Sequence, residues 1–307
     1  MSGWTLARLD AILATFLDRA RYTLGHSADT CRYYKGAYQN FRRFLLLAVT
    51  TLDDPLPVTW TAIDPWLAWN RKRGLAPTSL RTYWGALRSI FDELARLHGI
   101  ASPFVDAKAP PVPRLVPKAR SFDDCQRILY AAEHAPWRTG FEQARAVAVL
   151  ATFLYTGLRR GEVLRLGLND VNLMAGTLLV QRGKGTGGGK DRTVYLAPEL
   201  RPVLARYLAE RRRLGLTGPE FFLSPTTNRG VSLSTLRRLA ATVRRVSDIP
   251  FTLHSLRHSF VSHLLQAGAP LHVVSALAGH SQLTTTARYL GVWADDQRRE
   301  IQKLSFR

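Results

Sequence analysis

The sequence His254-Ser255-Leu256-Arg257-His258 lies in the last third of the chain and is followed by Gly279-His280 and then by Tyr289. An upstream segment reads Thr156-Gly157-Leu158-Arg159-Arg160-Gly161-Glu162, and Lys184 stands 25 residues after the first arginine of that segment. Arginines, histidines, one lysine and one tyrosine therefore recur at short spacings. Because arginine presents a planar fork of charged donors that fits phosphate oxygens, the combination suggests chemistry at a phosphate group.

The charge of the chain points to the same class of partner. The 307 residues include 43 basic and 23 acidic side chains, a formal net charge of +20, and 36 of the basic residues are arginine. Residues 1–110 carry 14 basic and 9 acidic side chains, and residues 111–307 carry 29 and 14. A polyanionic partner is the economical interpretation, with solvated surface charge as the alternative. Since both parts are basic, a clamp with DNA between them would fit.

Length and composition narrow the class of protein further. A chain of 307 residues with 46% apolar content usually folds as two domains. Cys31 and Cys125 are 94 residues apart, which argues against a zinc site or a disulfide framework and favours a reducing cytoplasm. Charges at Arg8, Asp10 and Asp18 exclude a signal-peptide core, and the longest weakly polar run has 13 residues. We expect a soluble protein without a membrane partner.

The first part of the chain predicts a helical domain over residues 1–100. Apolar residues recur every three or four positions in four stretches between residues 4 and 98, which predicts four helices. Ser27 and Thr59 are candidate N-caps, and no strand pattern interrupts the helices. Several arginines on these helices are expected to contact the DNA backbone: Arg42, Arg43, Arg71, Arg73, Arg81 and Arg88. Five prolines between Gly99 and Pro117 then predict an extended linker over residues 101–120.

Residues 121–307 predict a second, mostly helical domain with one β excursion. The β-prone runs 178–180 and 193–196 flank a glycine-rich segment, which predicts a hairpin with residues 183–190 at its tip. That segment is not a phosphate-binding P-loop, because Lys184 stands where the first glycine is required and Asp191 where a Ser or Thr is required. The expected fold class is therefore mainly α with a small β-hairpin or sheet.

The chain resembles the tyrosine recombinases, the family of phage integrases and Xer-type recombinases. That family combines a T-G-L-R segment, a lysine on a β-hairpin, an H-x-L-R-H box, an L-G-H triplet and a tyrosine nine residues later. Every position is matched here in order, with Ala278 in place of the leucine of the triplet. The resemblance covers about residues 27–305 and implies an N-terminal four-helix core-binding (SAM-like) domain and a catalytic domain that close round a duplex.

The resemblance also implies an active site that needs no metal, cofactor or ATP. Tyr289 would be the nucleophile, Arg159 and Arg257 would clamp the scissile phosphate, and His280 would donate a further hydrogen bond to it. Lys184 would be the general acid to the departing 5′ oxygen, with Lys190 as the fallback, and His254 would accept or orient the tyrosine proton. Glu162, three residues after Arg159 and on the same helical face, would hold that arginine.

The expected function is site-specific recombination of double-stranded DNA through a 3′-phosphotyrosyl intermediate and a Holliday junction. A homo-tetramer, or a hetero-tetramer with a related recombinase, would act in the cytoplasm of a bacterium or archaeon, associated with the nucleoid. Three alternatives remain open: a mobile-element integrase or transposase, a type IB topoisomerase, and a DNA-binding architectural protein with an idle site. A thin apolar stripe over residues 294–304 predicts a tail helix that docks on a neighbouring subunit.

Overall fold

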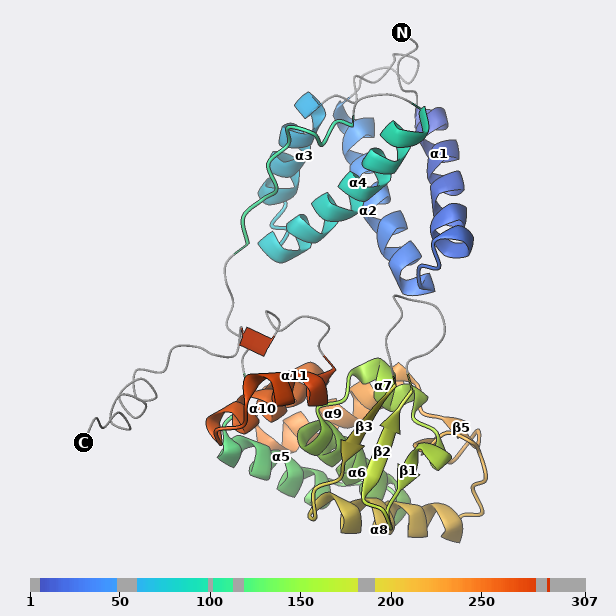
Figure 1. The fold of residues 1–307 in the computed structure, drawn as a ribbon, viewed down its shortest axis with the longest axis vertical. Helices are drawn as coiled ribbons and strands as arrows, with labels where there is room; N and C mark the ends of the chain where they lie inside the picture. Colours follow the sequence, from blue (N-terminus) through green and yellow to red (C-terminus); the bar gives the residue numbers. More distant parts are fainter. Residues whose placement is uncertain are drawn as a thin grey trace, which may run out of the picture. The chain divides into compact units, whose positions relative to one another are not determined.

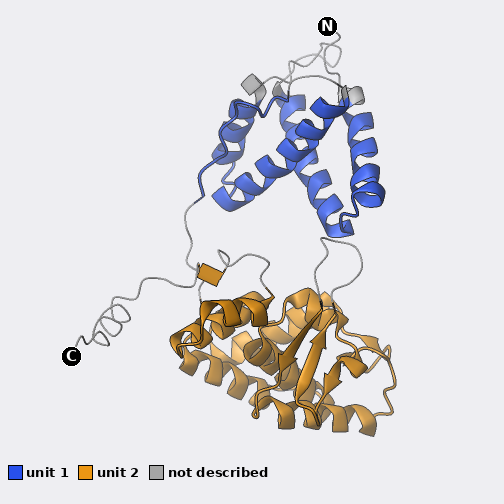
Figure 2. Cartoon of the chain, in the orientation of Figure 1, with its two compact units in different colours: residues 1–115, 183–188 blue, residues 116–182, 189–307 orange. Residues whose placement is uncertain are grey.

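A computed structural model describes residues 6–48, 60–98, 102–112, 119–181, 191–279 and 286–287. These residues form two compact units, one up to residue 112 and one from residue 119 onward (Figures 1 and 2). Helices dominate both units, and the strands are short. The predicted fold class, mainly α with a small sheet, is confirmed.

The first unit contains the four predicted helices. They are α1 (Leu6–Asp18), which continues into a π-helical turn (Arg19–Thr23), α2 (Ala28–Ala48), α3 (Trp60–Lys72) and α4 (Pro77–His98). Ser27 caps α2 as expected, since its hydroxyl accepts a hydrogen bond from the Thr30 amide at 3.1 Å. The predicted cap Thr59 lies outside the described residues. The apolar faces meet in an aromatic core in which Trp66 and Phe91 pack edge-on against Phe41.

The start of the predicted linker packs on this first unit. Phe104 is fully buried, with its ring 5.6 Å from that of Trp84 and 5.7 Å from that of Phe91. Arg81 donates a hydrogen bond to the carbonyl oxygen of Pro110 at 3.2 Å. Residues 102–110 therefore extend the helical unit beyond residue 100.

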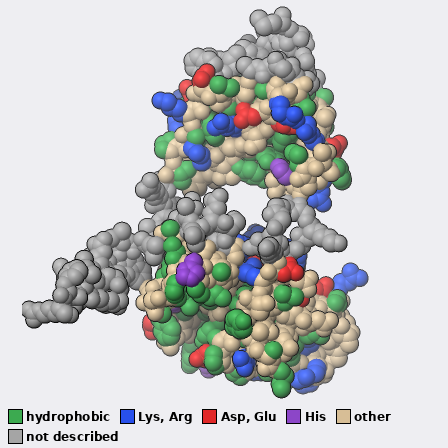
Figure 3. Space-filling model, in the orientation of Figure 1, with side chains coloured by type: hydrophobic (Ala, Val, Ile, Leu, Met, Phe, Trp, Pro, Cys, Tyr) green, Lys and Arg blue, Asp and Glu red, His purple; other side chains and the backbone are tan. Residues whose placement is uncertain are grey.

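Most arginines predicted to face DNA lie on the surface of this unit. Exposed side chains are those of Arg43, Arg71, Arg73, Arg81 and Arg88. Arg42 is half-buried and pairs with Asp10 at 3.0 Å. Lysine and arginine side chains are visible on the face of the unit drawn in Figure 3. Contact with DNA by this group stays a prediction.

The second unit is built around one buried helix. α6 (Gly140–Thr156) is apolar on almost every side and packs against α5 (Phe122–His134), α8 (Leu200–Arg213) and α10 (Leu253–Gln266). A short helix, α7 (Arg160–Arg165), follows α6 and leads into a 3-10 turn (Leu168–Asp170). The remaining helices are α9 (Leu233–Ser247) and α11 (Leu271–Ala278). The central position of α6 places its C-terminal end among segments that are distant in the sequence.

Two small antiparallel sheets complete the second unit. β1 (Val171–Asn172), β2 (Thr177–Val180) and β3 (Arg192–Tyr195) form one sheet in that order, with Leu178 opposite Val194. β4 (Leu223–Ser224) and β5 (Arg229–Gly230) form the other. The pairing of β2 with β3 confirms the predicted hairpin, whose tip from residue 182 to 190 lies outside the described residues. None of the described helices has the length and apolar character needed to cross a membrane.

Candidate active site

The site begins at Gly157, where α6 ends. This residue adopts a left-handed conformation with φ of 60°, and its amide donates to the carbonyl oxygen of Phe153. A Cβ atom at this position would lie 2.2 Å from Cδ1 of Phe260 on α10. Both the backbone conformation and the close approach of α10 therefore require glycine. The turn directs the next residues, Leu158 and Arg159, into the site.

Arg159 and Glu162 hold each other at the start of α7. The backbone amide of Arg159 donates to Oε2 of Glu162 at 2.7 Å, and its Nη1 donates to Oε1 at 3.0 Å. The same guanidinium donates through Nη2 to the carbonyl oxygen of Gly279, 120 residues later in the sequence. The structure thus contains the contact between Glu162 and Arg159 that the spacing suggests. About 42% of the Arg159 side chain remains exposed and available to a ligand.

Glu162 has a second arginine partner that the sequence did not reveal. Arg192, the first residue of β3, donates to both carboxylate oxygens of Glu162, at 2.9 and 2.8 Å. Burial opposes ionisation of Glu162, but the hydrogen bond from Arg192, the Arg159 amide and the two positive charges outweigh it and lower its pKa to about 2. Because the partners are 30 residues apart, no local spacing points to this pair. The available signal is a basic residue at the first position of the strand that follows the hairpin tip.

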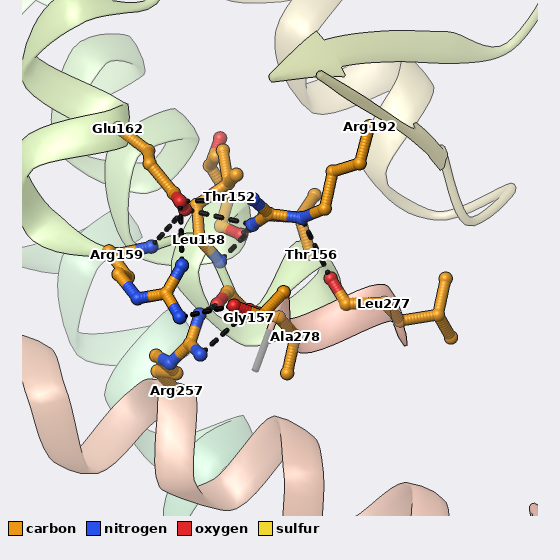
Figure 4. A network of polar contacts seen from close by, with 11 residues as sticks. Thr152, Thr156, Gly157, Leu158, Arg159, Glu162, Arg192, Arg257, Leu277 and Ala278 are labelled. Carbon is orange, nitrogen blue, oxygen red and sulfur yellow. Dashed lines mark hydrogen bonds and ion pairs between the residues drawn. The ribbon is translucent and has the colours of Figure 1, made fainter. Parts of the chain in front are cut away.

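Arg257 is the most deeply buried of the predicted site residues that the structure describes, with 2% of its surface exposed. It lies on α10 and donates through Nη1 to the carbonyl oxygen of Gly157 and through Nη2 to that of Ala278 at 2.7 Å. Gly279 follows in a left-handed conformation and caps α11. Arg159 and Arg257 thus converge on consecutive carbonyl groups at the end of α11, immediately before His280 (Figure 4).

His254 lies in the first turn of α10, two residues after the N-cap Thr252, and its side chain is exposed. Partial desolvation, together with the positive charges of Arg257, Arg159 and Arg160, lowers its pKa from the ordinary value. The lowered pKa favours the neutral imidazole, the state in which a histidine can accept a proton.

A pocket of about 740 Å³ opens beside these residues, between the starts of α7 and α10 and one face of α9. Its polar lining is predominantly cationic, because it includes the four arginines Arg159, Arg160, Arg237 and Arg244 beside His254 and Thr252. No acidic side chain is among the residues that line it. Such a surface suits a phosphate-bearing ligand.

The described residues bring together Arg159, Glu162, Arg257 and His254 in one region. The other predicted site residues, Lys184, Lys190, His280 and Tyr289, lie outside the described residues. Within the described part of the chain, no three His, Cys, Asp or Glu side chains are grouped as a metal site would need.

Comparisons of the chain with family models and with known proteins agree on one family. Residues 121–294 match the phage integrase family. The chain is 31% identical to tyrosine recombinase XerA of Pyrococcus horikoshii over 239 residues, which cover 77% of each protein. It is 30% identical to tyrosine recombinase XerD of Listeria innocua over 274 residues, covering 87% of this chain and 89% of the relative.

Solved structures show the same fold. The XerH site-specific recombinase bound to difH substrate in a pre-cleavage complex matches with a TM-score of 0.72 at 19% identity, over 95% of this chain and 83% of that one. A lambda integrase dimer bound to a COC′ core site matches with a TM-score of 0.70 at 20% identity, over 97% and 99%.

Proposed function

The chain belongs to the phage integrase family, and on that premise we propose that it is a site-specific DNA recombinase that cleaves and rejoins strands through a covalent bond to its own tyrosine. The observation that carries the proposal is the convergence of Arg159 and Arg257 beside a cationic pocket. Arg257 is held by two backbone carbonyl groups, and Arg159 by one carbonyl group and the Glu162 carboxylate, so both charges are oriented before a phosphate arrives. Preorganised charge of this kind stabilises a pentacoordinate phosphate without reorganisation.

In the cleavage step, the phenol oxygen of Tyr289 attacks the scissile phosphorus and forms a 3′-phosphotyrosyl bond, while the bond to the 5′ oxygen breaks. Lys184 gives its proton to the departing 5′ oxygen, and His254 accepts or orients the proton of the tyrosine. Arg159, Arg257 and His280 balance charge on the non-bridging oxygens. The lowered pKa of His254 supports its assigned role.

Rejoining reverses these steps with a different strand. The free 5′ hydroxyl of the partner strand attacks the phosphotyrosyl bond, a new phosphodiester forms and Tyr289 is released. One phosphoester replaces another, so ATP is not required. Because the two arginines supply the charge that a metal ion would otherwise provide, the proposal includes no metal.

The proposed partner is double-stranded DNA, bound between the two basic parts of the chain. Four copies, all identical or paired with a related recombinase, would hold two duplexes and pass strands in pairs through a Holliday junction. The site of action would be the nucleoid. The net charge of +20 supports a polyanionic partner.

Covalent trapping tests the proposal. Protein purified under denaturing conditions from cells is digested, and the attached DNA is sequenced to define the target. A duplex of that sequence, nicked near the cleavage point, is then incubated with the protein in EDTA. We expect a 3′ adduct on a peptide that contains Tyr289, and no adduct with Tyr289→Phe, which should still bind the duplex. An adduct formed by the Phe variant, or loss of wild-type cleavage in EDTA, would contradict the mechanism.

A further inference from the structure

Arg192 contacts two of the segments that carry predicted site residues. Its two terminal nitrogens bind the Glu162 carboxylate, which also binds Arg159, and its Nε donates to the carbonyl oxygen of Leu277 at 3.1 Å (Figure 4). Its guanidinium also lies against Gly279, where a Cβ atom would be 2.8 Å from Cζ of Arg192. With only 11% of its side chain exposed, Arg192 is enclosed by the protein.

The contacts of Arg192 reach different parts of the proposed phosphate clamp, which is formed by Arg159, Arg257 and His280. Through Glu162, Arg192 fixes the guanidinium of Arg159, and through Leu277 it fixes the end of α11 immediately before His280. Three directional hydrogen bonds from one planar group define an orientation, which a flexible point charge cannot do.

We propose that Arg192 is a positioning residue that aligns Arg159 and the end of α11 for cleavage, acting through Glu162 and the carbonyl group of Leu277. The proposal rests on the recombinase function proposed above. It assigns Arg192 no contact with DNA, since its side chain is enclosed by the protein and three of its donors are directed to protein oxygens. Its loss should therefore slow the chemical step while DNA binding is retained.

Arg192→Lys is the informative variant. Lysine keeps a positive charge beside the buried carboxylate, so the fold should survive, but it cannot make two parallel hydrogen bonds and a third to Leu277. Two further variants are measured beside it. One is Arg192→Gln. The other carries both Arg192→Gln and Glu162→Gln, so that no buried carboxylate is left unpaired. Arg206→Gln is the matched control, because Arg206 also joins two helices through an ion pair, with Glu133, but its partners Glu133 and Gln143 are not predicted site residues and its side chain is half-exposed.

Single-turnover cleavage of the nicked duplex is compared with affinity for a single half-site and with the thermal melting curve. We expect Arg192→Lys to melt near the wild type, to bind the half-site equally well, and to cleave on the order of 10²-fold more slowly, the scale expected for misplaced catalytic groups. The single variant Arg192→Gln should cleave at least as slowly as Arg192→Lys. The loss of cleavage free energy in the double variant should be no larger than the sum of the losses caused by its two single changes. Arg206→Gln should cleave at the wild-type rate.

A second substrate separates this role from that of a general acid. When sulfur replaces the bridging 5′ oxygen, the leaving group needs no proton. The Arg192→Lys defect should persist on the sulfur substrate, because the phosphate clamp is still misaligned. Restored cleavage on sulfur, wild-type rates on both substrates, or a loss explained by weaker binding would each overturn the proposal. Failure of the wild type to form any adduct would instead refute the recombinase function itself.

Discussion

Arg257 donates a hydrogen bond to the carbonyl oxygen of Gly157, 100 residues earlier in the chain, at the point where α6 ends. The two residues belong to the two motifs that distinguish the sequence, so this bond joins them directly. Gly157 therefore has two functions. Its left-handed conformation ends α6, and its carbonyl oxygen accepts a hydrogen bond from the buried Arg257. The geometry of this turn should therefore affect both folding and chemistry.

Gly157→Ala should lower the free energy of unfolding by about 2–5 kcal/mol, from left-handed strain and from overpacking against Phe260. The added Cβ would lie 2.2 Å from Cδ1 of that ring. Gly215→Ala is the control, because Gly215 has a similar φ of 64° but no atom near the added Cβ. Chemical denaturation should show a clearly larger loss at position 157. Equal losses at both positions would mean that the contact with Phe260 contributes nothing.

Arg159→Ala and Arg257→Ala should each slow cleavage by ~10²–10³-fold, the scale of one lost oxyanion donor. Their effects on folding should differ. Arg257 is 2% exposed and satisfies two backbone carbonyl groups, whereas Arg159 is partly exposed. Melting temperature should therefore fall more for the Arg257 variant. Arg165→Ala, at an exposed position on α7, serves as the control and should cleave normally.

Glu162 should make folding stability depend on pH in the acid range. Its pKa is lowered to about 2 in the folded protein from an ordinary 4.5, so the carboxylate contributes stability above pH 4.5 that is lost as the pH falls toward 2. A shift of this size corresponds to roughly 3 kcal/mol at neutral pH. Unfolding titrations should show this dependence in the wild type and its loss in Glu162→Gln.

The exposed pair of Glu210 with Arg213 provides the comparison for that experiment. Glu210→Gln should change the pH profile little, because exposed ion pairs contribute little to stability. If stability depended on pH in the same way in Glu162→Gln and in the wild type, the Glu162 carboxylate would not be ionised in its contact with the two arginines.

Lys184→Ala should cleave an ordinary substrate slowly and a substrate with a bridging 5′ sulfur nearly as fast as the wild type does. The reason is that a sulfur leaving group departs without the proton that Lys184 is proposed to supply. Lys190→Ala is the control and should show little defect on either substrate. Rescue of the Lys190 variant in place of the Lys184 variant would move the general acid to Lys190.

Deletion of residues 293–307 should leave binding of one protein to one half-site nearly intact and abolish cooperative assembly and recombination. The predicted tail helix lies outside the described residues, and its apolar stripe, mainly Ile301 and Leu304, is too thin to fold alone. Docking on the next subunit in a cyclic arrangement would supply the missing surface. Gel-shift titration measures the cooperativity. Unchanged cooperativity would place the assembly contact elsewhere.

Much of the fold could be predicted from the sequence because its determinants are local. Apolar residues every three or four positions predict the helices of the first unit, Ser27 caps α2, and two β-prone runs around glycines predict the pairing of β2 with β3. The spacing of three residues between Arg159 and Glu162 likewise places both on one face of a short helix, where they form an ion pair.

The sequence by itself therefore determined the helical class, the hairpin and the identity of the candidate site residues. Only the tertiary structure decided how those residues are held. Arg257 and Arg159 bind carbonyl groups of Gly157 and Gly279, and a backbone oxygen has no residue type by which a sequence pattern could reveal it. Arg192 reaches Glu162 because β3 folds back beside α7, and Phe104 joins the first core because residues 102–110 pack on it. Such contacts depend on the packing of segments distant in the sequence, so they become visible only once the chain is folded.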